Sequence, residues 1–82
     1  MMTYTVAFYE GNANRTAIDK TFTDQFSAIY DARMIRDAYG FNTDVMNNET
    51  GVIIAIFRTH DNDYIDKNEI EEDARKIATL AR

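Results

Sequence analysis

The segment VIIAIFRT, Val52 to Thr59, constrains the fold more than any other part of the chain. β-Branched and aromatic residues favour strands, and every position from Ile53 to Phe57 is apolar. A strand that is apolar on both of its faces is typical of the interior of a sheet rather than its edge. We therefore expect a sheet with this strand in the middle.

Three other segments predict strands around it. TYTVAFYE is rich in β-branched and aromatic residues, and AIDKTF follows it after the Gly/Asn-rich connection GNANRT, which predicts a hairpin with an edge-like second strand. FNTDVM leads through the turn cluster NNETG into the central segment and predicts a second hairpin.

A helix is predicted between the two hairpins. TDQFSAIYDARMIRDAYG has no helix-breaking residue before Gly40, and Thr23 or Asp24 can serve as its N-cap. A glycine suits the left-handed position that follows a helix. At about 100° per residue, one side of this helix carries small or apolar residues that we expect to face the sheet: Ala28, Ala32, Ile35 and Tyr39.

The same helix carries a second apolar stripe, formed by Phe26, Tyr30 and Met34, nearly opposite the first. A helix that covers one face of a sheet should meet water there. Either a second helix or the first hairpin loop covers the stripe, or the stripe binds a partner or a second copy of the chain. Asp31, Arg33, Arg36 and Asp37 would form a charged rim around such a surface.

The C-terminal segment predicts a second helix that begins at Asp66. Glu69 then completes a variant capping box, and Ile65 with Ile70 form a hydrophobic staple. The predicted order is ββαββα, an α+β fold in which one small mixed or antiparallel sheet carries both helices on one face. Residues 1–82 are expected to form a single domain.

The stretch THDNDYIDKNEIEED holds half of the fourteen carboxylates. It does not match a calcium loop, because Ile65 and Asp66 stand where a ligand and the glycine are required. Helix-start electrostatics account for part of it, but Asp61, Asp63 and Asp73 have no evident cap or ion-pair partner in the sequence. We expect an acidic patch of Asp61, Asp63, Glu69 and Asp73 that binds a basic partner, or else a solvated helix start.

Composition narrows the classes of function. The net charge is −5 and the basic residues are scattered, which disfavours direct binding to nucleic acid and favours a protein with a basic groove or surface. The chain has no Cys and no apolar run long enough to span a membrane, so we expect a soluble, cytoplasmic protein without metal or cofactor. Ser27 and His60 do not form a catalytic arrangement, so we expect no enzyme.

The stretch from Ala28 to Phe57, AIYDARMIRDAYGFNTDVMNNETGVIIAIF, resembles small acidic orphan proteins of phages and prophages. That group includes anti-CRISPR proteins and nucleic-acid mimics that inhibit host defence. The resemblance implies an inhibitor of a nucleic-acid-handling host protein and identifies no site residue. The alternatives are a homodimeric structural or regulatory domain that uses the Phe26, Tyr30 and Met34 stripe, and a domain that binds a small ligand or a divalent ion.

Overall fold

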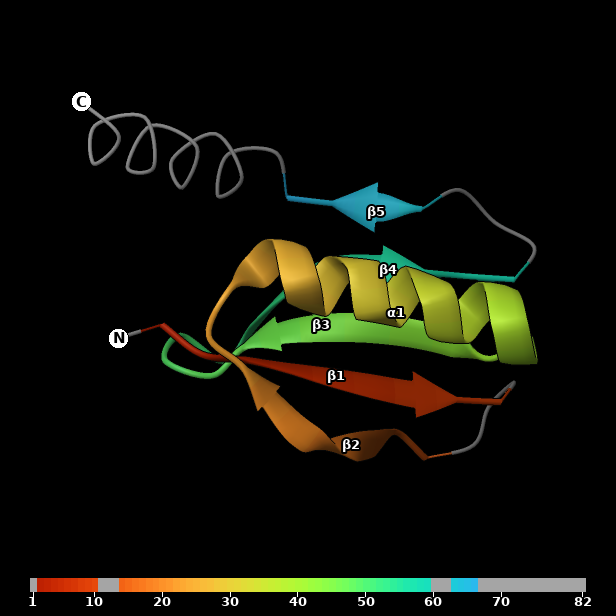
Figure 1. The fold of residues 1–82 in the computed structure, drawn as a ribbon, viewed down its shortest axis with the longest axis horizontal. Helices are drawn as coiled ribbons and strands as arrows, with labels where there is room; N and C mark the ends of the chain where they lie inside the picture. The colour runs from red at the N-terminus through yellow and green to blue at the C-terminus, as the bar shows by residue number, and fades with distance from the viewer. Residues whose placement is uncertain (1, 11–13, 60–62, 67–82) are drawn as a thin grey trace.

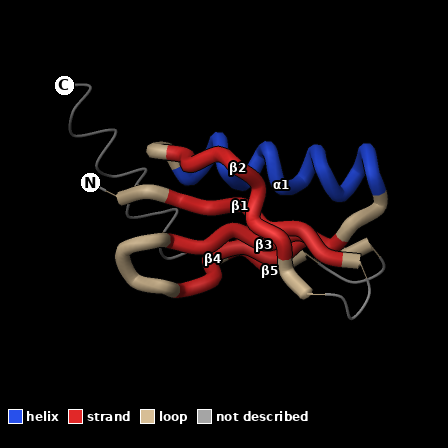
Figure 2. The backbone as a smooth tube through the Cα atoms, turned by 90° about the horizontal axis from the view of Figure 1, so that it is seen from below, coloured by secondary structure: helices blue, strands red, loops and turns tan. Residues whose placement is uncertain are grey.

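The computed structural model describes residues 2–10, 14–59 and 63–66. In chain order the elements are β1 (Tyr4–Tyr9), β2 (Thr16–Phe22), α1 (Gln25–Tyr39), β3 (Asn42–Asn47), β4 (Val52–Phe57) and β5 (Tyr64–Ile65). The strands form one sheet in the order β2-β1-β3-β4-β5, and every neighbouring pair is antiparallel. Figures 1 and 2 show α1 lying lengthwise across one face of this sheet.

The predicted α+β class and the antiparallel sheet are confirmed, and β2 lies at the edge of the sheet as expected. The finer prediction, ββαββα with two helices on one face, is not confirmed. The described residues form five strands and one helix. The second helix is predicted for the residues that follow a cap at Asp66, and residues 67–82 lie outside the described part of the chain.

The sequence predicts only a helix start in the acidic stretch THDNDYIDKNEIEED. The structure shows that Tyr64 and Ile65 of this stretch form a fifth strand, β5. Tyr64 and Ile65 pair with Ile56 and Ala55 along the outer edge of β4, and the Asp66 N–H donates to the Ile54 carbonyl at 2.7 Å. An uncovered edge would leave these backbone groups without partners in the sheet. The short strand therefore makes β4 an interior strand, as its apolar sequence predicts, although β3 rather than β4 lies in the middle of the sheet.

Both ends of α1 are capped as the sequence predicts. The Asp24 carboxylate accepts hydrogen bonds from the Phe26 and Ser27 N–H groups, each at 3.2 Å. Gly40 adopts a left-handed conformation with φ 72°, and its N–H donates to the Arg36 carbonyl at 2.9 Å. These contacts fix the helix between the two hairpins.

The core lies between α1 and the sheet. Val6, Val45, Ala55 and Ile65 form one row across four strands on the face toward the helix. Ala28 and Ala32 of α1 are fully buried, and the Thr43 hydroxyl donates to the Ala32 carbonyl at 2.8 Å, so the helix lies close to β3. The buried side of the helix is thus as predicted around these two alanines.

An ion pair lies on the opposite face of the sheet. Arg15, just before β2, binds Asp44 of β3 through two hydrogen bonds, and that from Nε to Oδ2 is 2.6 Å long. Asp44 is directly paired with Ala7 in the ladder, and both are buried. The hydrogen bond to Asp44 raises the pKa of Arg15 above its ordinary value despite partial desolvation. Arginine is always charged in proteins, so this contact is an ion pair that spans β1, the strand between β2 and β3.

The described part of the chain contains no helix that is long and apolar enough to cross a membrane.

Candidate functional site

The second stripe of α1 is exposed. Phe26, Tyr30 and Met34 have exposed fractions of 38%, 66% and 48%. They follow one another at four-residue spacing, so they share one side of the helix. Among the described residues nothing buries this stripe, whereas the predicted second helix and the tip of the first hairpin loop lie outside them, so both interpretations of the stripe stay predictions.

The charged rim predicted around this stripe is only partly present. Arg33, at the margin of the stripe, is exposed, and so is Asp37. Both arginines reach back over the Phe57 ring of β4, with the guanidinium carbons of Arg33 and Arg36 5.4 and 5.5 Å from its centre. Arg36 lies about 100° before Asp37 on the helix, close to the side that faces the sheet, and is half-buried.

Arg36 also corrects the prediction that Asp63 has no ion-pair partner. Its guanidinium donates to Asp37 Oδ1 at 2.9 Å, to Asp63 Oδ1, and to the Arg58 carbonyl at 3.4 Å. Desolvation alone would lower the pKa of Arg36, but the hydrogen bonds to Asp37 and Asp63 outweigh it and raise the pKa. Asp63 thus joins the segment before β5 to the helix.

The rest of the predicted acidic patch cannot be placed. Asp61, Glu69 and Asp73 lie outside the described residues, as does His60. Among the residues that the structure describes, no group of three or more His, Asp or Glu side chains could hold a metal ion. The expectations of an acidic binding patch and of a chain without metal or catalytic activity therefore stay predictions.

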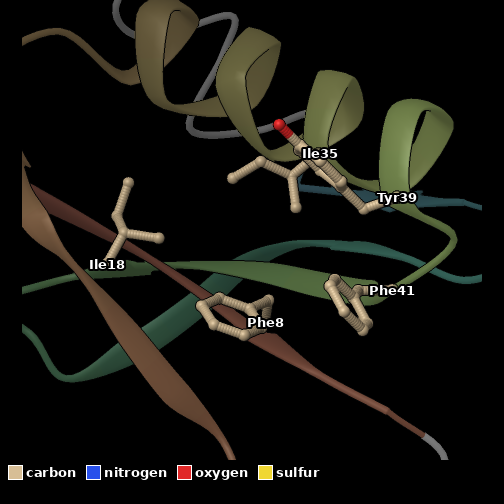
Figure 3. Close-up of a pocket in the computed structure, with 5 residues that line it drawn as sticks. All are labelled: Phe8, Ile18, Ile35, Tyr39 and Phe41. Atoms are coloured by element: carbon tan, nitrogen blue, oxygen red, sulfur yellow. The ribbon is translucent and has the colours of Figure 1, made fainter.

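An apolar pocket lies beside α1, on the flank that faces β2. Its volume is about 210 Å³, and its walls are Phe8 of β1, Ile18 of β2, Ile35 and Tyr39 of α1, and Phe41 after the helix. Figure 3 shows the five side chains around a common space, with Ile35 and Tyr39 on the helix side and the other three on the sheet side.

Aromatic contacts hold one end of this pocket in shape. The ring centroids of Phe8 and Phe41 are 5.4 Å apart in a tilted arrangement, and those of Tyr39 and Phe41 are 6.4 Å apart and stacked. Both distances lie in the range of attractive aromatic pairs. Phe41 therefore positions the Tyr39 ring at the edge of the pocket.

Sequence reasoning missed this pocket because it assigned Tyr39 to the buried side of the helix. Tyr39 is 72% exposed, so the prediction is wrong for this residue. It occupies the last turn of α1, where the chain turns through Gly40 into β3, and its ring packs on Phe41 instead of the core. The signal in the sequence was two aromatic residues flanking the glycine that ends the helix.

Comparisons with protein-family models, with curated proteins and with solved structures found no match to this chain.

Proposed function

We propose that this domain is a non-enzymatic protein-binding module that uses the outer side of α1. The observation that carries the proposal is the exposure of Phe26, Tyr30 and Met34 along one side of a well-capped helix. Aromatic residues and Met are enriched in protein interfaces, where they provide large contact areas or adapt their shape. A helix that presents such residues at four-residue spacing can bind a groove in a partner.

The sharper form of this proposal is an inhibitor of a nucleic-acid-handling protein, of the small acidic phage type. The net charge of −5 supports it, because an acidic chain is attracted to the basic grooves that hold nucleic acid. In this form the apolar stripe supplies the contact area and the carboxylates speed the encounter.

Self-association through the same stripe is the second candidate. A standard interface buries roughly 800 Å² on each partner, whereas an aromatic side chain contributes roughly 150 to 250 Å². Tyr30 and Phe26 are partly covered already, so the stripe alone is too small for a stable dimer. Any binding surface here must extend further around the helix.

The test compares two variants, each of which replaces one exposed tyrosine by a negatively charged glutamate. Tyr30→Glu alters the stripe, whereas Tyr64→Glu alters β5, where Tyr64 is also exposed. We expect wild type and Tyr64→Glu to capture the same proteins from a host lysate treated with nucleases, and Tyr30→Glu to lose them while it keeps its melting temperature. Equal capture by both variants would exclude the stripe.

Sedimentation of the three proteins separates the second candidate from the first. If the stripe joins two copies, wild type and Tyr64→Glu are dimers and Tyr30→Glu is a monomer. If it binds another protein, all three are monomers in isolation.

A further inference from the structure

We propose that the apolar pocket beside α1 holds one aromatic or branched aliphatic side chain of a protein partner whose neighbouring residues are basic. This inference rests on the proposed function and names a second contact made by the same partner. The pocket residues are Phe8, Ile18, Ile35, Tyr39 and Phe41.

The size and chemistry of the pocket define the group that fits. Four of the five lining side chains are hydrocarbon, and Tyr39 alone carries a hydroxyl. A polar group placed there would lose water without gaining hydrogen bonds, which disfavours it. The volume of about 210 Å³ exceeds that of a 150 Å³ cavity known to hold benzene. One ring or one branched aliphatic group therefore fits.

A side chain carried by a protein suits this pocket better than a free molecule does. A small hydrocarbon group gains only its own burial, and no lining group fixes its orientation, so a free ligand would bind weakly. When the group belongs to a protein that already contacts α1, the other contacts bring it to the pocket at a high effective concentration.

The pocket and the exposed stripe lie on adjoining parts of the helix surface. Met34 ends the stripe and Ile35 lines the pocket, about 100° further round the helix. Ala38 lies between them, and it is exposed and small. A segment bound along Phe26, Tyr30 and Met34 can therefore cross Ala38 and reach the pocket. This continuity also supplies the additional area that the stripe lacks.

Charge indicates the kind of segment. Two charged residues flank the pocket: Asp31 lies one turn before Ile35 on α1, and Lys20 lies two residues after Ile18 on the same face of β2, above the Phe22 ring. The preference for a basic segment therefore comes from the net charge of −5 of the chain as a whole. Basic residues on either side of the inserted group would be attracted to this surface, whereas acidic residues would be repelled.

The test uses synthetic peptides and the isoleucine methyl groups of the full chain. The probe is a blocked pentapeptide with phenylalanine between two pairs of lysines; in one control alanine replaces phenylalanine, and in the other glutamates replace the lysines. NMR titration should give saturable shift changes at the Ile18 and Ile35 methyls. Ile29 reports on the opposite flank, because it packs against the core outside the pocket. We expect at least ~10-fold weaker binding for the alanine peptide.

Variants that fill the pocket with a larger side chain are compared with a variant that makes the same change outside it. Ile35→Phe and, on the exposed edge strand, Ile18→Phe should abolish the methyl shifts caused by the probe, whereas Ile29→Phe on the other flank should not. The methyl spectrum of each variant shows whether it is folded, and two pocket variants on different elements keep the test decisive if one fails to fold.

Five results would overturn the inference. The first two are equal binding of the phenylalanine and alanine peptides, and equal binding of the lysine and glutamate peptides. The others are shifts outside the pocket, binding of free toluene as tight as that of the probe, and methyl shifts that depend on protein concentration without peptide. The last two would assign the pocket to a free molecule or to a second copy. The proposed function fails separately, through Tyr30→Glu in the capture experiment, because Tyr30 does not line the pocket.

Discussion

Arg36 connects α1 to the segment before β5 through Asp63 and stabilises a strand of only two residues. The side chains of Arg36 and Asp63 have exposed fractions of 17% and 31%, so water screens the pair only in part. Partly exposed pairs of this kind contribute roughly 0.2 to 1 kcal/mol, and a favourable geometry places them toward the upper end.

We therefore predict that Asp63→Asn lowers the free energy of unfolding by roughly 0.5 to 1 kcal/mol. Asp37→Asn is the control, because Asp37 is more exposed, at 57%, and its loss leaves the bond between Arg36 and Asp63 in place. Urea unfolding of Asp63→Asn, Arg36→Gln and the double variant Arg36→Gln/Asp63→Asn completes a double-mutant cycle that measures the coupling between the two side chains. A coupling energy of zero would mean that the ion pair between Arg36 and Asp63 does not stabilise the fold.

At the scale of elements, α1 owes its position to its caps, and Asp24 is the one that can be tested without altering the core. Replacing it by Ala removes two hydrogen bonds to backbone N–H groups and should destabilise the domain by roughly 0.5 to 2 kcal/mol. Asp24→Asn keeps an acceptor and should cost less. Thermal unfolding followed by circular dichroism measures both, and equal melting temperatures for Asp24→Ala and wild type would contradict the assignment of this cap.

The same element shows how far the sequence can predict the fold. Capping residues, the buried alanines and the turn before β4 are local signals, and the structure confirms them. β5 could not be predicted from the sequence. Its two residues are too few to show the alternation of apolar and polar side chains that marks a strand, and they form a strand only because they pair with β4. The exposure of Tyr39 likewise depends on its contact with Phe41, a residue beyond the end of the helix, so helical spacing alone could not predict it.

At the scale of the whole molecule, net charge and apolar surface contribute to binding in different ways. The carboxylates of the acidic stretch also differ in what they contact. Asp63 is engaged with Arg36, so it should be left intact when the acidic patch is tested. Asp61 and Asp73 lie outside the described residues, and their sequence offers no cap or ion pair. In a chain with a net charge of −5, removing two such charges should relieve repulsion.

We therefore predict that the double variant Asp61→Asn/Asp73→Asn keeps or raises the melting temperature, whereas adding Asp63→Asn lowers it again. Against a captured basic partner, the double variant should associate more slowly at low salt and show a flatter dependence of the association rate on salt, with little change in the dissociation rate. Tyr30→Glu should instead speed dissociation at every salt concentration, because an apolar contact is only weakly screened by ions. If the double variant associates at the wild-type rate at low salt, the carboxylates do not attract the partner, and the apolar surface of α1 alone accounts for binding.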